Sequence, residues 1–237
     1  MKLIYPFMSN KKVFIKHHLG LGDAIVHNGM VRKIFEEKNC DIFLASKFNN
    51  LDNVMFMYRD NPRINVIGVN NDYEMDQLIN NNQYDEIISS HFDTGKLRYD
   101  LDFDDSFYKI VNMNPNVKQE NFYIERNDDK ENEVFDILIT QKNIDKYIFL
   151  HEKSTENILI DRNKIRNDLP IIYADKQFKT FDLLKVIENA EECHIISSSF
   201  LSLFTCKKYN KNVFAHMYAD RIELKDYIIK NNIEVII

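Results

Sequence analysis

Short apolar runs alternate along the chain with stretches in which apolar residues recur every three or four positions. The runs have the length of buried strands, and the recurring positions indicate amphipathic helices. This alternation predicts parallel sheets with helices on both faces. Strands are expected at 11–18, 40–46, 64–69, 84–91, 146–152, 169–175, 193–199, 212–218 and 234–237, and helices at 23–39, 49–60, 72–81, 127–142, 180–192, 200–210 and 223–232.

The alternation is interrupted between 92 and 116, where the acidic and aromatic stretch 98–110 is expected to form a helix or a lid. A charge cluster, NDDKEN at 127–132, opens the next helix. We therefore predict an α/β protein of two tandem Rossmann-like domains, 1–126 and 127–237. Each is a doubly wound parallel sheet. In such folds the ligand binds at the carboxyl ends of the strands, often between the two halves.

The composition excludes several classes of binding partner and cellular location. The net charge of −6 over 237 residues argues against a broad basic face for nucleic acid. No stretch approaches the roughly 20 apolar residues of a membrane span, and the first residues have no apolar core of a signal peptide. Cys40, Cys193 and Cys206 are an odd set without CxxC spacing, which favours a reducing compartment. We expect a cytoplasmic protein, in a bacterial cytosol or, for a virus, in the host cytoplasm.

The stretch HHLGLGDAIVHNG, at 17–29, holds three of the five glycines. A strand leads into Gly20-Leu21-Gly22 and then Asp23, where the free N–H groups of a starting helix favour an anion such as a diphosphate. The dinucleotide fingerprint would need glycine where Ile25 stands, and no GK[ST] follows for a P-loop. A strand–turn–helix connection that Asp23 caps stays an alternative. His27, one turn after Asp23, is expected to line the same cleft.

Two stretches of the second half carry candidate phosphate ligands. Ser197-Ser198-Ser199 end a strand and lead into a helix, so their hydroxyls are placed to bind a phosphate or a sugar. The alternative is that one serine is only an N-cap. His151, Glu152 and Lys153 follow another strand, where the lysine would neutralise a phosphate and the histidine would bind a ribose or phosphate oxygen. A solvated loop is the alternative there.

Two of these stretches resemble glycosyltransferases of the GT-B type, nearest to the group of ADP-heptose:lipopolysaccharide heptosyltransferases. LGLGDAIVHNGMVRKI, at 19–34, is similar to that group's first strand, its glycine-rich loop with a Gly-Asp pair, and its first helix. Residues 180–218 are similar to the helix, strand, small-residue loop and helix that hold the sugar nucleotide. The serine-rich loop also resembles fucosyltransferase-like GT-B proteins.

The resemblance implies an enzyme that moves a sugar from a nucleotide-activated donor to a glycan or other hydroxyl acceptor. It implies Asp23 as the general base. The histidines lack the spacing of metal ligands, so we expect no metal and no cofactor besides the donor substrate. We expect donor or phosphate contacts from Gly20, Gly22, His151, Lys153, Ser197, Ser198, Ser199 and Phe200, and acceptor-side contacts from His18, His27 and Asn28.

Three alternatives stay open from the sequence. The first is a non-catalytic GT-B-like protein that binds nucleotide or glycan, or that serves as a scaffold for a partner enzyme. The second is another nucleotide-using enzyme such as a phosphoryl transferase, which the lack of a recognisable phosphate loop disfavours. The third concerns assembly: the modest size of each half leaves a homodimer open.

Overall fold

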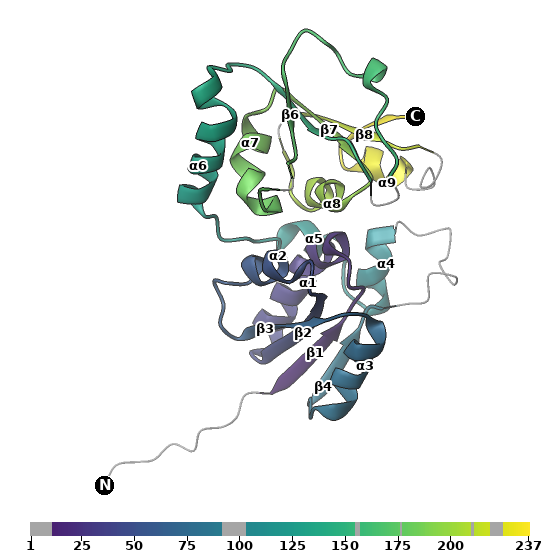
Figure 1. Cartoon of the computed structure of the whole chain (residues 1–237). Helices are drawn as coiled ribbons and strands as arrows, with labels where there is room; N and C mark the ends of the chain where they lie inside the picture. Colours follow the sequence, from purple (N-terminus) through teal and green to yellow (C-terminus); the bar gives the residue numbers. More distant parts are fainter. Residues whose placement is uncertain (1–10, 92–102, 155–156, 176, 210, 219–224) are drawn as a thin grey trace.

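Two separate parallel sheets organise the chain, one in each half (Figure 1). A computed structural model describes residues 11–91, 103–154, 157–175, 177–209, 211–218 and 225–237. The first sheet has the order β3-β2-β1-β4 and the second the order β6-β5-β7-β8-β9. The strands are β1 Lys12–Lys16, β2 Asp41–Lys47, β3 Ile64–Val69, β4 Glu86–Ser89, β5 Ile148–His151, β6 Ile171–Tyr173, β7 Glu192–Ile196, β8 Asn212–His216 and β9 Glu234–Ile236.

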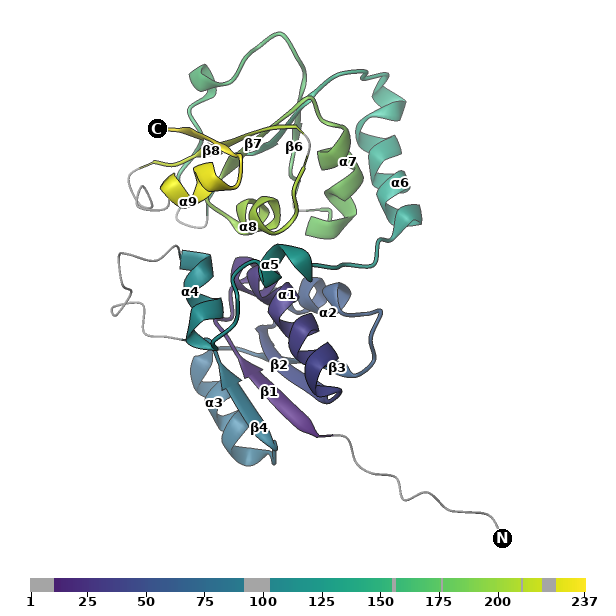
Figure 2. The ribbon, with the colours of Figure 1, turned by 180° about the vertical axis from the view of Figure 1, so that it is seen from behind.

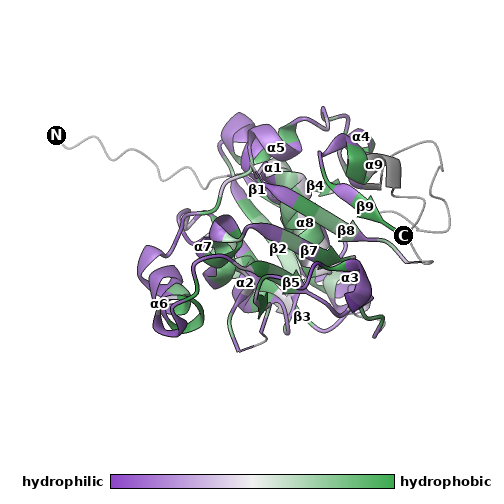
Figure 3. Cartoon of the chain, turned by 90° about the horizontal axis from the view of Figure 1, so that it is seen from above, coloured by the Kyte–Doolittle hydropathy of each residue, from purple (hydrophilic) through white to green (hydrophobic). Residues whose placement is uncertain are grey.

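The helices mostly follow the strands, as parallel pairing requires. They are α1 Leu21–Lys38, α2 Leu51–Met57, α3 Asp72–Asn81, α4 Phe103–Ile110, α5 Val117–Glu120, α6 Asp128–Leu138, α7 Leu184–Asn189, α8 Ser199–Cys206 and α9 Lys225–Lys230, with short 3₁₀ turns η2 Thr140–Lys142, η3 Arg162–Lys164 and η4 Thr180–Leu183. Hydrophobic residues gather in the strands and in α8 at the centre, whereas α3 and α6 present hydrophilic stretches outside (Figure 3).

The period of two along β1 sends neighbouring side chains to opposite faces. Val13 and Ile15 join the large core formed with α1 and α2, while Phe14 joins a small cluster with Met75 of α3. The second sheet is covered unequally. Helices α7 and α8 pack on one face, and the other is covered by the segment 157–170, which contributes Ile160 and Ile165.

The hydrophobic core is continuous across the boundary between the two halves. Residues of α1 and of α8 belong to one buried cluster, and Cys206 Sγ lies 3.7 Å from the carbonyl oxygen of Ile25. Phe56 of α2 stacks on Phe181 of η4, with ring centroids 5.5 Å apart. Figure 2 shows α5 and α8 between the two sheets, with the segment from α5 to α6 running along one side. The halves are therefore packed on each other and not merely tethered.

The expected α/β fold of two parallel sheets is confirmed, but several element ends differ from the prediction. The expected helix 127–142 ends at Leu138 and continues only as the turn η2. The expected helix 180–192 is split into η4 and α7, and Thr180 does not cap it, because Lys179 is the N-cap residue. The strand expected at 193–199 ends at Ile196.

The irregular segment between the halves is only partly described. Residues 92–102 lie outside the described part of the chain, and 103–110 form α4. The predicted boundary at 126/127 falls between α5 and α6, and it stays a prediction. Cys40, Cys193 and Cys206 are buried and unpaired. Among the described residues, none of the helices has the length and apolarity that crossing a membrane demands.

The contact between α1 and α5 generates a prediction for stability. A Cβ atom at Gly29 would collide with the carbonyl oxygen of Val117 and come within 3.0 Å of that of Lys118. We expect G29A to lower the free energy of unfolding by about 1–3 kcal/mol, because backbone must move. G68A is the matched control, since its Cβ would meet the exposed ring of Phe48, which can turn away. Urea unfolding that finds both variants equally stable would contradict the close approach.

Candidate functional site

The strand order of the first sheet reverses between β1 and β4, whose carboxyl ends lie side by side. Lys16 pairs with Ser89, and the N–H of Ser90 donates to the carbonyl of Lys16 at 3.0 Å. The residues that follow, His17-His18 after β1 and Ser90-His91 after β4, thus meet at one point. This is where open parallel sheets bind ligands.

Asp23 lies in the first turn of α1, as the third residue of that helix. The prediction that it caps the helix is wrong, because α1 begins two residues earlier and its N-cap is Gly20. Its carboxylate instead lies against Gly20, where an added Cβ atom would collide with Oδ2. A carboxylate in the first turn is stabilised by the unpaired N–H groups there. Its role as general base stays a prediction.

Four histidines and one phenylalanine form a row of rings beside this helix start. The centroid of His17 lies 4.9 Å from that of His27, and His27 lies 4.6 Å from Phe107 of α4. The ring of Phe107 is 5.7 Å from that of His18, which stacks on His91 at 4.2 Å. The predicted acceptor-side residues His18 and His27 are thereby brought together. The outer pair, His18 and His91, is partly exposed, whereas His17 and His27 are buried.

The inner histidines are neutral. His27 donates from Nδ1 to the carbonyl of Asp23 at 2.6 Å, so its Nε2 accepts from Ser90 Oγ at 2.7 Å. This bond ties the first turn of α1 to the end of β4. Burial lowers the pKa of His27 well below its ordinary value and that of His17 to about 4, since the charged form loses hydration.

Asn28 is fully buried and has a structural partner. Its Oδ1 accepts from the N–H of Tyr123 at 2.9 Å, which fastens the segment between α5 and α6 to α1. The predicted acceptor-side role of Asn28 is untested.

On the second sheet, the predicted donor residues meet at the neighbouring ends of β5 and β7. His151 pairs with Ile195, and its ring lies 4.8 Å from that of Phe200, which is buried. Ser197 follows β7, Ser198 is the N-cap residue of α8, and Ser199 begins that helix. The Ser198 hydroxyl oxygen is inaccessible and has no hydrogen-bond partner among the described residues. A buried hydroxyl that lacks a hydrogen-bond partner at the start of a helix is suited to bind an oxygen atom of a ligand.

Lys153 stands at the start of a small hairpin that follows β5. Its backbone pairs with Leu159 in an antiparallel bridge, and the N–H of Ile160 donates to the carbonyl of Glu152 at 3.0 Å. The Lys153 side chain is exposed. The hairpin therefore fixes its backbone and leaves its amine to solvent.

Gly22 brings the two groups of predicted residues together. A Cβ atom there would come within 2.8 Å of Ser202 Oγ and 3.6 Å of Ser199 Cα, so α1 and α8 pack closely at this point, and an alanine would require the Ser202 hydroxyl to turn away. The starts of both helices, with Asp23 on one and Ser198 on the other, thus face the same boundary. Whether Gly20 and Gly22 also contact a donor stays a prediction.

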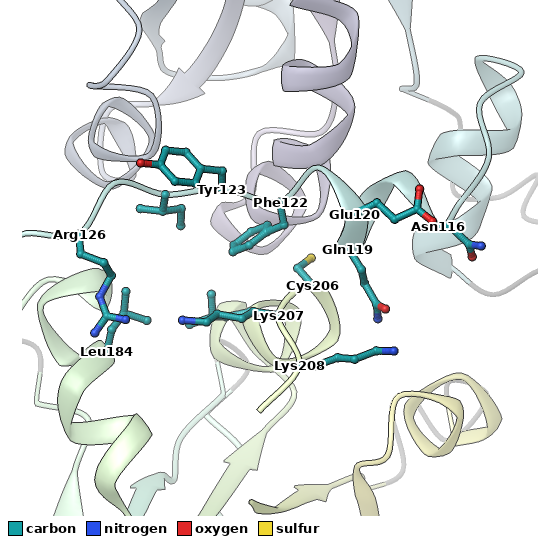
Figure 4. A pocket seen from close by; sticks show the side chains of 12 residues that line it. Asn116, Gln119, Glu120, Phe122, Tyr123, Arg126, Leu184, Cys206, Lys207 and Lys208 are labelled. Atoms are coloured by element: carbon teal, nitrogen blue, oxygen red, sulfur yellow. The ribbon is translucent and has the colours of Figure 1, made fainter. Parts of the chain in front are cut away.

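Two open cavities lie elsewhere. One, of about 610 Å³, is formed between the segment 116–126 and the end of α8, with Phe122 and Cys206 inside and Arg126, Lys207 and Lys208 at its rim (Figure 4). The other, of about 660 Å³, runs along α2 and β3. Neither is lined by a predicted donor or acceptor residue.

Sequence reasoning missed Ser90, His91 and Phe107 as parts of the candidate site. The available signal was that Ser90-His91 end an expected strand just as His17-His18 do. Phe107 gave no signal, because its neighbours in the row of rings, His18 and His27, are 89 and 80 positions away in the chain. Within the described ranges, no group of three or more His, Cys, Asp or Glu side chains is arranged to hold a metal ion.

No protein-family profile and no curated protein matches the sequence. Two glycosyltransferases are among the solved structures that are similar to the chain. One is a glycosyl transferase family 9 protein from Veillonella parvula DSM 2008, with a TM-score of 0.59 and 11% identity over 86% of this chain and 80% of that one. The other is ADP-heptose lps heptosyltransferase II of E. coli, with a TM-score of 0.59 and 8% identity over 95% and 90% of the chains.

These neighbours define the class of fold. The chain has the two-sheet α/β architecture of these glycosyltransferases, and the resemblance that the sequence predicted is confirmed at the level of the fold. At 8% and 11% identity the likeness does not extend to donor, acceptor or activity.

The buried histidines generate a pH prediction. Because the folded state holds His17 at a pKa of about 4, against about 6.5 when unfolded, it binds fewer protons than the unfolded chain below pH 6.5. The stability from this group is complete above pH 6.5 and is lost as the pH falls towards 4, by up to about 3 kcal/mol. Urea unfolding between pH 7 and pH 4.5 should show this loss.

H17N keeps a donor for the carbonyl of His18, which His17 Nδ1 contacts at 2.5 Å, and removes the titrating group. We expect a shallower fall of stability with pH in H17N. The control H91Q changes a partly exposed ring of the same row and should retain the wild-type slope. Identical slopes in H17N and wild type would show that another group causes the acid sensitivity.

Proposed function

We propose that the chain is a glycosyltransferase that moves a sugar from a nucleotide-activated donor to a hydroxyl acceptor without using a metal ion. One observation supports this: Gly22, next to Asp23 in the first turn of α1, packs against Ser199 and Ser202 of α8, so the starts of the two helices lie at one boundary. The fold shared with two glycosyltransferases supports it.

The proposed chemistry needs a base on one side and charge stabilisation on the other. Asp23 takes the proton from the acceptor hydroxyl, whose oxygen forms a bond to the anomeric carbon of the donor sugar. The bond from that carbon to the diphosphate breaks, and the nucleoside diphosphate leaves with the electron pair. The N–H groups at the start of α8, the Ser198 hydroxyl and the Lys153 amine stabilise the leaving charge. His18 and His27 are proposed to face the acceptor.

A second function is favoured by one specific observation. The close contact of Gly22 with Ser199 and Ser202 narrows the space between the two helix starts, and neither cavity lies there. A GT-B-like protein that binds a nucleotide or a glycan without turnover, or that holds a partner enzyme, fits that packing. A homodimer and a cytoplasmic location are further proposals that rest on the sequence.

A thermal-shift panel of UDP-, GDP-, ADP-, CMP- and dTDP-linked sugars and the free diphosphates tests both functions. A ligand at about 100 times its Kd stabilises the folded state by about 2.7 kcal/mol, which gives a clear rise in melting temperature. We expect one nucleotide class to raise it. If none of these ligands raises the melting temperature, both the transferase function and the nucleotide-binding alternative are contradicted. The alternative that then remains is a protein that holds a partner enzyme.

A substitution of Asp23 distinguishes an effect on turnover from an effect on donor binding. With the donor that the panel identifies, D23N should lower turnover by about 10²–10⁴-fold while its melting-temperature shift with donor stays near that of wild type. D128N is the control, since Asp128 is also a first-turn carboxylate, at the start of α6, although it is more exposed than Asp23. If D23N and wild type turn over equally, Asp23 is not the base. Donor binding without turnover in wild type favours the binding protein.

Ser198 tests the donor side. S198A removes a hydroxyl that has no hydrogen-bond partner among the described residues, so the free energy of unfolding should stay the same or rise by up to about 1 kcal/mol. Binding of the nucleoside diphosphate should weaken by about tenfold, because a hydrogen bond to a charged group is lost. S46A, which removes a buried serine hydroxyl of β2 that donates to the carbonyl of Lys47, should bind like wild type. Unchanged affinity in S198A would remove this residue from the site.

A further inference from the structure

A chain of hydrogen bonds runs across the second sheet, on the face that the segment 157–170 covers. His194 of β7 and His216 of β8 lie side by side, with His194 Nδ1 2.9 Å from His216 Nε2. His194 Nε2 is 3.3 Å from Glu192 Oε2, and His216 Nδ1 is 3.1 Å from the hydroxyl oxygen of Tyr218. Both imidazoles are buried, at 3% and 0% exposure. None of these groups takes part in the proposed transfer.

One arrangement of protons satisfies every member of this chain. The Glu192 carboxylate only accepts, so His194 carries its proton on Nε2 and accepts at Nδ1 from His216. His216 Nδ1 then accepts from the hydroxyl of Tyr218. The Tyr218 oxygen in turn accepts from the backbone N–H of Asp161 at 2.9 Å. Both histidines are therefore neutral in the folded chain.

The two ends of this chain are also two of the groups that hold the segment 157–170 in place. At one end, Arg166 donates to Glu192 Oε1 at 2.9 Å. At the other end, the N–H of Asp161 donates to Tyr218. Between these points, Ile160 and Ile165 pack on the strands, and the Lys164 amine donates to the carbonyl of Ile237. The histidine pair thus lies between two of the polar contacts that hold the segment.

An added proton disturbs this arrangement. The first added proton reverses the direction of these hydrogen bonds. His194 then donates from Nδ1 to His216, and His216 donates from Nδ1 to the Tyr218 oxygen. The proton of the Tyr218 hydroxyl thereby loses its acceptor. A second proton would set N–H against N–H across 2.9 Å. Described charges face the pair from all sides: Glu192 on β7, Glu234 on β9, and Asp161, Lys164 and Arg166 on the segment.

The balance of these charges disfavours the imidazolium. Burial, followed by the neighbouring His194 and Lys164, lowers the pKa of His216 to about 4 against the opposing attraction of Asp161. Burial also lowers the pKa of His194, although Glu192 acts in the opposite direction. A charged pair would also repel Lys164, which is part of the segment itself.

We propose that the His194–His216 pair is an acid-sensitive latch, which holds the segment 157–170 on the second sheet when both rings are neutral and releases it when they are protonated. The segment is continuous with the hairpin that carries Lys153, so release would also free the backbone of a proposed donor residue. That consequence rests on the proposed function; the latch itself does not.

Hydrogen–deuterium exchange of the whole chain at pH 7 and pH 5, corrected for intrinsic rates, tests the latch with no nucleotide present. If the closed pKa of His216 is about 4 and the open value about 6.5, the opening constant should rise by about 20-fold between these pH values. We expect that rise in peptides from 157–170 of the wild type and also of H17N, in which the acid sensitivity assigned to His17 is removed. A rise in 157–170 that disappears in H17N would overturn the proposal, because it would then follow from unfolding of the whole chain.

Three variants separate the latch from general acid sensitivity. H216Q keeps a donor towards His194 and should lose most of the rise, whereas H91Q, in the other sheet, should keep it. Y218F deletes one anchor and should exchange fast in 157–170 already at pH 7. An H216Q variant with the full rise would assign the sensitivity to another group.

NMR titration of the wild-type imidazoles gives a test that needs no variant. The latch would also be overturned if His194 and His216 titrate near their ordinary pKa while the amides of 157–170 stay protected from exchange. If no nucleotide raises the melting temperature, the proposed latch is unaffected, because its test uses no nucleotide. If the exchange experiment contradicts the latch, the proposed glycosyltransferase function is unaffected.

Discussion

The close approach of α1 and α8 is the contact on which the arrangement of this protein depends. At Gly22 an added Cβ atom would come within 2.8 Å of Ser202 Oγ and 3.6 Å of Ser199 Cα, so the two helices are in direct contact there. This contact joins the cores of two sheets that share no hydrogen-bonded strand. The same contact sets the carboxyl ends of both sheets at one boundary. Without it, Asp23 and the serine loop would belong to two unrelated ends of the molecule.

Both halves of the chain contain buried, neutral imidazoles. In the first, His17 and His27 are buried behind the partly exposed pair His18 and His91, and hydrogen bonds to carbonyls fix their protons. In the second, His194 and His216 bind each other on the sheet. In each case burial depresses the pKa, so the folded state tolerates protons poorly. Acid sensitivity is thus distributed over the fold, while its structural consequences differ between the halves.

The two sides of the boundary differ in what they offer a ligand. The α1 side has a carboxylate and neutral rings, which suit the uncharged hydroxyls of a sugar or glycan. The α8 side has a helix start, a buried hydroxyl without a partner and a nearby exposed lysine, which suit a diphosphate. This asymmetry is what a transfer from a charged donor to a neutral acceptor requires. A protein that only binds a nucleotide would need the α8 side alone.

The sequence by itself determined the alternation of strands and helices, and with it the two parallel sheets and the position of each candidate motif after a strand. Those features are local, since apolar periodicity is set by neighbours in the chain. It could not determine that Asn28 would be buried, because α1 is covered by its sheet, by α5 and by α8, and only their packing reveals this. Asp23 was misjudged as a cap because helix ends depend on one or two residues of backbone geometry. The row of rings around Phe107, the His194–His216 pair and the contact at Gly22 were decided by tertiary structure, because each joins residues that only strand register or helix packing brings together.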